Sequence, residues 1–294
     1  MSDNADIQND FFVPNLVIPA LMVLTNAILI HGIRKLNKLQ SISWRHSMAL
    51  SINNTCYGTI IIARSTLLKL TKVAKPYTVI ALSSRCLLFI IGLYSFLLVL
   101  LITVDRYIHI TRPMQYNLIM TPRKSTLLLA TLFATSIALT CTIIVGFVFA
   151  LATVILPVIS TIAFLCFMFI VILYYRTYTT LERRIRQARF QRRTRTTLRN
   201  PSKAFSKAVL LTVSTMFFCC IPFLFTKPLA SYYPENRTVL IIEFIADELI
   251  YTNWVINALI MIYLDRRLRS YVIQTITCSR NRVVRMTTQI TSHY

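Results

Sequence analysis

Apolar residues fill long stretches of this 294-residue chain, and short polar segments separate the stretches. A helix needs about 20 consecutive apolar residues to cross a bilayer, because each residue advances it by about 1.5 Å. The pattern therefore predicts an all-α membrane protein. The predicted spans are residues 11–33, 46–68, 77–105, 125–149, 152–175, 207–225 and 239–264.

The fourth and fifth spans lie in one uncharged stretch, residues 125–175. A single helix of that length would measure about 76 Å, against a hydrocarbon core of about 30 Å. Two crossings joined by a tight turn near residues 146–153 resolve the mismatch. We expect a seven-transmembrane helix bundle over residues 11–264, preceded by the segment 1–10 and followed by residues 265–294.

The distribution of charge predicts the orientation of the bundle. The net charge is +22, although charged residues make up only 14% of the chain. If the amino terminus is extracellular, 25 of the 32 Lys and Arg residues fall in cytoplasmic segments. Because cytoplasmic loops of membrane proteins are enriched in Lys and Arg, we expect residues 1–10 outside and residues 265–294 inside.

Two charged segments flank the last spans. The run from Glu182 to Arg195 contains many arginines, which in isolation suggests nucleic acid. Between two spans it is more consistent with a helical extension lying on anionic lipids, so we expect no nucleic-acid partner. Residues 265–274 are amphipathic and predict an eighth helix along the membrane. Cys278 beyond it is a candidate for palmitoylation, with an unmodified thiol as the alternative.

Enzymatic chemistry has little support in the sequence. The four glycines lie far apart, so no phosphate-binding loop can be built from them. Neither H-E-x-x-H nor G-x-S-x-G occurs, and the seven cysteines show no C-x-x-C spacing. We expect no enzyme, no cofactor and no metal, and we interpret most cysteines as small packing residues.

An apolar run starting at Ser95 ends at Asp105, Arg106 and Tyr107 and leaves through Pro113. This stretch resembles the Asp-Arg-Tyr signature of rhodopsin-like (class A) G-protein-coupled receptors, followed by their second intracellular loop. The resemblance implies a plasma-membrane receptor that passes the signal of an unknown extracellular ligand to a heterotrimeric G protein.

The resemblance also implies roles for individual residues of this region. Arg106 would pair with Asp105 at rest and meet Gα in the active state, and Met114 would pack on Gα. The acid that often restrains this arginine from the sixth span is replaced by Ser202.

Other positions match the polar core and the switches of the family, with departures. Asn54 stands where the family usually has Asp, and Cys220 stands where it has Trp. These changes predict weak sodium binding and high basal activity. A plain hydrogen-bonded cluster is the alternative to a sodium site, and we favour it. The matching residues are Asn26, Asn54, Ser95, Cys220, Pro222, Asn253 and Asn257.

Five ionisable residues fall in the outer halves of spans and can form either a polar ligand pocket or an internal salt bridge. In the second case Arg64 or Arg85 would pair with Asp247 or Glu248. Both alternatives stay open, and Glu243 shares a helix face with Asp247. The candidates are Arg64, Arg85, Glu243, Asp247 and Glu248.

Single positions in the sequence argue against two types of ligand and predict one modification. No lysine occurs in residues 239–264, which excludes a retinal Schiff base there. Leu88 stands where amine receptors carry Asp, which argues against a biogenic amine. Asn236 begins an outer-side glycosylation sequon close to the seventh span.

Two other classes of protein compete with the receptor. A seven-helix scaffold or decoy would bind a partner without coupling to a G protein, and the altered switch residues favour it somewhat. A transporter or channel would need internal repeats or broken helices at the bilayer midplane, and neither is visible in the sequence.

Overall fold

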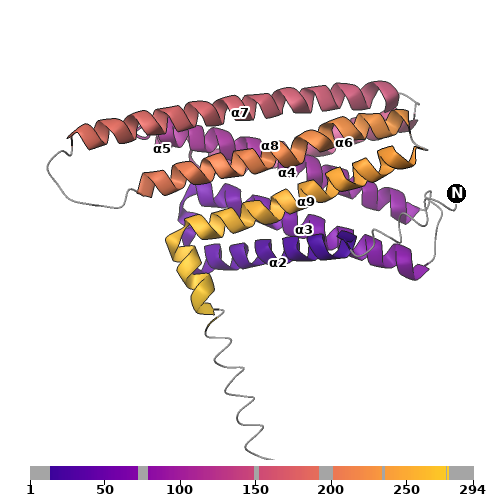
Figure 1. Ribbon diagram of the computed structural model, residues 1–294, viewed down its shortest axis with the longest axis horizontal. Coiled ribbons are helices and arrows are strands. Elements are labelled where there is room, and N and C mark those ends of the chain that lie inside the picture. The colour runs from indigo at the N-terminus through magenta and orange to yellow at the C-terminus, as the bar shows by residue number, and fades with distance from the viewer. Residues whose placement is uncertain are drawn as a thin grey trace, which may run out of the picture.

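The computed structural model describes residues 14–71, 79–148, 152–191, 201–233, 236–275 and 277. The described part contains seven long helices that lie side by side along a common direction (Figure 1). They are α2 (Pro14–Lys35), α3 (Ile42–Thr71), α4 (Val79–Thr111), α6 (Pro122–Val148), α7 (Ala152–Gln191), α8 (Pro201–Tyr232) and α9 (Arg237–Leu264).

Three short elements follow long helices on one side of the bundle. They are the 3-10 helix η1 (Lys38–Gln40), the single turn α5 (Tyr116–Ile119) and a helical segment over residues 266–275. The chain turns sharply between α2 and η1 at Asn37, which adopts a left-handed conformation with φ of 49°. Asn tolerates this conformation better than most residues.

The long helices form a closed ring. Each of the pairs α2 and α3, α3 and α4, α4 and α7, α7 and α8, and α8 and α9 packs together, and α9 packs against α2 to close the ring. The helix α6 lies outside this ring against α4. The ring brings segments from both ends of the chain together, so α2 and α9 can share one site.

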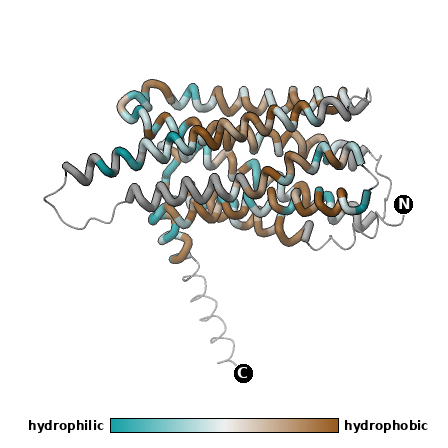
Figure 2. The backbone as a smooth tube through the Cα atoms, turned by 45° about the horizontal axis from the view of Figure 1, so that its top comes forward, coloured by the Kyte–Doolittle hydropathy of each residue, from teal (hydrophilic) through white to brown (hydrophobic). Residues whose placement is uncertain are grey.

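Four of the described helices contain segments that are long and apolar enough to cross a membrane. These are Leu16–Lys35, Ser83–Thr111, Pro122–Gly146 and Pro157–Thr180. Figure 2 shows the apolar residues along the helices and the hydrophilic stretch at the end of α7. The chain is therefore a multi-pass helical membrane protein.

The outward surface of the bundle is apolar, as a membrane requires. Leu127 of α6 is 65% exposed and Leu165 of α7 is 62% exposed. These side chains are exposed from the protein because lipid surrounds them in the membrane.

The helices α2 and α3 approach each other closely at Gly58. A Cβ atom at this position would lie 2.7 Å from Cε of Met22, 2.9 Å from Cγ2 of Val23 and 3.1 Å from the backbone oxygen of Pro19. Small residues let helix backbones approach closely in membranes, where packing rather than water drives association. Gly58 therefore sets the distance between α2 and α3.

The uncharged stretch 125–175 forms two separate helices, α6 and α7. Several helices run further than the predicted spans: α7 continues to Gln191 and α8 extends from Pro201 to Tyr232. The predicted amino-terminal segment 1–10 and Cys278 lie outside the described residues.

Candidate functional site

Buried polar residues cluster at three levels along the bundle. One cluster lies in the middle, one at the end that carries η1 and α5, and one near the opposite end. Burial of polar groups in a membrane bundle is unfavourable unless they are paired, so each cluster is a candidate functional site.

Ser95 of α4 organises the middle cluster. Its Oγ donates a hydrogen bond to Oδ1 of Asn54, at 3.1 Å, and accepts one from Nδ2 of Asn53, at 2.5 Å. Asn53 also donates to the backbone oxygen of Ile91, at 2.9 Å. All three side chains are buried. The sequence analysis missed Asn53, although a second asparagine at mid-span was a signal for a polar contact.

The predicted polar-core residues Asn26, Asn54 and Asn257 line one cavity of about 80 Å³. Asn26 donates a hydrogen bond to the backbone oxygen of Met22 in its own helix, at 2.9 Å. Asn253 is buried one turn before Asn257 on α9. The middle cluster and this cavity therefore join residues of α2, α3, α4 and α9.

The two predicted switch residues of α8 lie elsewhere. Cys220 packs against the apolar cluster of Phe167, Ile170 and Met216, between α7 and α8. Pro222 lies inside α8, two residues further along. Neither side chain lines the cavity. The side chain of Ser202 lies outside the described residues.

Asp105 is the centre of the second cluster, and it is fully buried. Its Oδ1 accepts a hydrogen bond from the hydroxyl of Tyr116 in α5, at 2.7 Å, and lies 3.9 Å from Nδ1 of His46. Nε2 of His46 lies 2.8 Å from Oγ of Ser125 in α6. The carboxylate thus ties α4 to α5 and lies beside α3.

The expected partner of Asp105 at rest was Arg106, whereas its hydrogen bond comes from Tyr116. The other oxygen, Oδ2, has no hydrogen-bond partner among the described residues. Burial and the hydrogen bond to Asp105 raise the pKa of Tyr116 above its ordinary value, so the phenol keeps its donor proton at neutral pH. Sequence reasoning missed Tyr116 because the contact depends on how the loop folds back.

Arg106 also lines the cavity of the polar core, together with Tyr174 of α7. Its neighbour Tyr107 is half-buried, and Pro113 is exposed beyond the end of α4. Met114 is 92% exposed, which is unusual for a large apolar side chain. The arginine and an apolar contact point therefore lie at the same end of the molecule.

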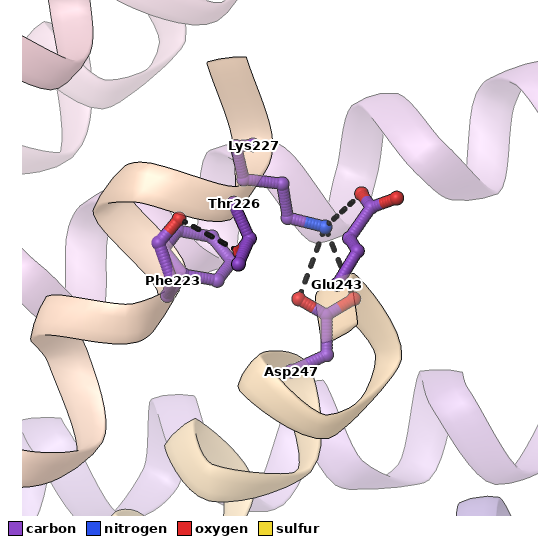
Figure 3. A network of polar contacts seen from close by, with 5 residues as sticks. All are labelled: Phe223, Thr226, Lys227, Glu243 and Asp247. Carbon is purple, nitrogen blue, oxygen red and sulfur yellow. Dashed lines mark hydrogen bonds and ion pairs between the residues drawn. The ribbon is translucent and has the colours of Figure 1, made fainter. Parts of the chain in front are cut away.

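Lys227 of α8 forms the third cluster with two acids of α9 (Figure 3). Its Nζ donates to Oε1 of Glu243, at 2.8 Å, and to Oδ2 of Asp247, at 3.0 Å. Nζ also lies 5.1 Å from the centre of the Phe223 ring. The shared helix face of the two acids follows from their spacing of four residues.

This ion pair corrects the predicted salt bridge. The predicted partner of Asp247 or Glu248 was Arg64 or Arg85, whereas Lys227 holds Asp247. Lys227 was missed because it lies beyond the predicted sixth span of residues 207–225. Glu248 is buried, and neither of its carboxylate oxygens has a hydrogen-bond partner among the described residues.

Aromatic side chains lie next to this cluster. The rings of Tyr57 and Trp254 meet edge to face with centroids 4.7 Å apart, and Tyr251 lies 5.9 Å from Tyr57. The end of the bundle opposite η1 and α5 thus combines an aromatic cluster with the ion pairs between α8 and α9.

The helical segment 266–275 packs against the end of α2 that precedes η1. Lys38 forms an ion pair with Asp265, and Leu268 is fully buried against Leu29, Ile33 and Ala258. Burial of Asp265 raises its pKa, but the hydrogen bonds from Lys38 and from the backbone of Leu268 lower it more, so the pKa falls below its ordinary value.

Asn236, the predicted glycosylation residue, caps the start of α9. Its Oδ1 accepts hydrogen bonds from the backbone N–H groups of Thr238 and Val239, at 3.0 and 3.3 Å. Asparagine is a preferred residue at this position because it satisfies free N–H groups of the first turn. Its side chain is exposed.

The apolar helices and the buried polar cavity are those of a multi-pass helical membrane protein. The sequence model of the family described as 7 transmembrane receptor (rhodopsin family) matches residues 25–150. Over residues 25–150 this match supports the resemblance to the receptor family seen in the sequence. No curated protein matches the chain.

Proposed function

We propose that the chain is a G-protein-coupled receptor that transmits the binding of an extracellular ligand to a heterotrimeric G protein. One observation carries the proposal: Arg106 lines the same cavity as Asn26, Asn54 and Asn257. A rearrangement of the polar core can therefore reach the arginine directly. The match of residues 25–150 to a receptor family supports the same function.

The proposed topology has seven crossings, with the amino terminus outside the plasma membrane and the carboxyl terminus in the cytoplasm. The predominance of Lys and Arg in the segments assigned to the cytoplasm supports this orientation. The same charges favour contact with anionic lipids. The segment 266–275 acts as the eighth helix along the membrane surface, anchored through Leu268 to α2 and α9.

The resting state is held at the cytoplasmic end by Asp105 and Tyr116. Their hydrogen bond, at 2.7 Å, fixes α5 and hence the second intracellular loop against α4. In the active state α8 moves outward, Arg106 extends into the opened cavity, and Met114 packs on Gα. The exposure of Met114 supports its role as an apolar contact.

The altered switch positions favour high basal activity. Asn54, Cys220 and Ser202 replace an acid, a tryptophan and a second acid that restrain receptors of this family. A shift of a two-state equilibrium from 1:99 to even requires only about 2.7 kcal/mol. The loss of two or three contacts worth about 1 kcal/mol each is sufficient for that shift.

The ligand binds among the outer charges of α3, α4 and α9 in this proposal. The absence of lysine from residues 239–264 excludes retinal as a Schiff base on α9. Leu88, buried on α4 where amine receptors carry an acid, argues against a biogenic amine.

Complex formation between the purified chain and a heterotrimeric G protein tests the proposal. We expect the chain in nanodiscs to retain nucleotide-free G protein on gel filtration, and the Arg106→Ala variant to lose the complex. Arg112→Ala removes an exposed charge six residues away and serves as the matched control. A wild-type chain that retains none of the four Gα classes contradicts the proposal and favours the non-signalling scaffold or decoy.

A further inference from the structure

Arg64 and Arg85 occupy equivalent positions on two antiparallel neighbours. The helices α3 and α4 touch at Tyr57 and Gly92, where a Cβ on the glycine would lie 3.6 Å from the tyrosine ring. Arg64 follows Tyr57 by seven residues, and Arg85 precedes Gly92 by seven. Seven residues make nearly two full turns and about 10.5 Å of rise. Both arginines therefore stand on the facing sides of α3 and α4, at one level above the aromatic cluster.

Arg64 and Arg85 have no counter-charge in the described part of the chain. Among the described residues, no carboxylate lies within ion-pair distance of either arginine. Glu243 and Asp247 of α9 are held by Lys227.

Arg64 also has a donor that no group in the described part of the chain uses. Its Nε is buried and has no hydrogen-bond partner there. A buried donor without a partner is unfavourable by about 1–3 kcal/mol, and more when the group is charged. Two guanidinium groups on the facing sides of neighbouring helices, one with a buried free donor, form a site that is complete only when an anion binds.

We propose that Arg64 and Arg85 bind the anionic group of the receptor's ligand, a carboxylate or a phosphate. A guanidinium presents its N–H groups in a planar fork that matches either anion with two hydrogen bonds. The rings of Tyr57, Tyr251 and Trp254 lie about two turns deeper and take the apolar body of the ligand. The proposal rests on the proposed receptor function, because the site becomes a signalling site only in a receptor.

The anion has two possible sources. It is either a separate organic anion or a carboxylate of this chain outside the described residues. The acids outside the described residues are Asp3, Asp6, Asp10 and Glu235. In the second case the amino-terminal segment occupies the site as a tethered ligand, with three acids in its first ten residues.

Direct binding to the purified full chain in nanodiscs of zwitterionic lipid tests the proposal. The probes are phenyl phosphate and benzoate, with benzylammonium as the cation of matched shape. We expect the two anions to bind saturably and to raise the midpoint of thermal unfolding, because a ligand that binds only the native state stabilises it. Benzylammonium is expected to leave the midpoint unchanged.

Substitutions assign the binding to the two arginines. Arg64→Gln and Arg85→Gln are each expected to weaken anion binding about tenfold or more, since a hydrogen bond to a charged group contributes about 1.5–3 kcal/mol. Arg64→Lys keeps the charge but not the fork, so it restores part of the affinity. Arg237→Gln removes an exposed outer charge at the start of α9 and should change nothing.

A combined variant, Asp3→Asn, Asp6→Asn and Asp10→Asn, separates the two sources. Tighter binding of phenyl phosphate by this variant than by the wild type identifies the chain's own segment as the occupant. Equal binding identifies a separate anion. If Arg64→Gln does not fold, the exposed Arg85 carries the test.

Two results overturn the proposal: no anion binding by the wild type or by the amino-terminal variant, or anion binding that both glutamine variants retain in full. The measurement involves no G protein. A chain that binds anions through the arginines but forms no complex with G protein therefore contradicts the receptor function and leaves the anion site standing.

Discussion

At the scale of single residues, Tyr116 and Lys227 provide the hydrogen-bond and ion-pair partners of buried or half-buried acids. Tyr116 satisfies Oδ1 of Asp105 through one short hydrogen bond. Lys227 lies between two carboxylates from the neighbouring helix (Figure 3). Each side chain comes from a different element than the acid it binds, so each contact holds two elements together.

The Tyr116→Phe substitution is expected to loosen α5 against α4. It removes the hydrogen bond to Asp105 and leaves a fully buried carboxylate without a donor among its described neighbours, which lowers stability by about 1–3 kcal/mol. The midpoint of thermal unfolding of the purified chain should fall by several degrees. Tyr94→Phe is the control, because that hydroxyl makes only a long bond of 3.4 Å to the backbone of Leu129. Equal shifts in the two variants would disprove the special role of Tyr116.

The Lys227→Met substitution is expected to reduce folding and surface expression. It leaves Glu243 and Asp247 facing each other without a cation, and we expect a loss of about 1–3 kcal/mol. Adding Glu243→Gln and Asp247→Asn should restore much of the expression, because the repulsion between the acids is then removed. Cell-surface staining of intact cells measures both. If Lys227→Met expresses normally, the ion pair has no role in stability.

At the scale of helices, the apolar pattern predicted the elements better than it predicted their ends. The uncharged stretch 125–175 was long enough to require two crossings, and it forms α6 and α7. The ends of α7 and α8 could not be derived from hydropathy, because charged residues continue a helix once it has left the apolar layer. The boundary of the sixth span was the reason that Lys227 was missed.

The sequence predicted some contacts of the polar core and not others. Asn54 and Ser95 were expected together and are hydrogen-bonded. The two hydrogen bonds of Ser95, one of them with Asn53, depend on how α3 is rotated about its axis relative to α4. The sequence does not specify this rotation. The contact between Asp105 and Tyr116 depends on a loop that folds back across eleven residues, and hydrophobic periodicity carries no information on it.

Packing of α2 against α3 depends on Gly58. Gly58→Ala adds a Cβ that would lie 2.9 Å from Val23 and 3.1 Å from a backbone oxygen of α2, so the helices must separate. We expect a lower unfolding midpoint for this variant. Gly92→Ala places a Cβ 3.6 Å from Tyr57, which is ordinary contact, and should be tolerated. A midpoint for Gly58→Ala at or above that of Gly92→Ala would contradict this account of the interface.

The attachment of the segment 266–275 should depend on pH through Asp265. Its folded-state pKa lies below the ordinary value, chiefly because Lys38 and backbone N–H groups outweigh the effect of burial. The ion pair therefore contributes its full stability above the ordinary pKa of aspartate, about 3.9, and loses it as the pH falls through the lower folded value. The protection factors of the amides of residues 266–275, which correct for the intrinsic pH dependence of exchange, should be constant from about pH 5 to 8, and Asp265→Asn should abolish any acid-induced change. An acid-induced change that persists in the variant would assign it to another group.

At the scale of the whole molecule, the ring of helices connects the Lys227 ion pairs near one end of the bundle with Arg106 near the other. Arg106 lines the same cavity as Asn26, Asn54 and Asn257 of the polar core. Since α9 carries both the outer acids and Asn257, a displacement of this helix reaches both ends of the molecule. This connection is the central claim of the proposed receptor function.

Guanine-nucleotide exchange on purified Gα, catalysed by the purified chain without added ligand, tests that claim most directly. We predict exchange above the rate of empty nanodiscs, no exchange with Arg106→Ala, and partial silencing with Asn54→Asp, which restores the usual acid of the polar core. The wild type and the variants must be incorporated into the nanodiscs in equal amounts. Exchange at the rate of empty nanodiscs with all four Gα classes, or exchange that Arg106→Ala leaves unchanged, would contradict the account.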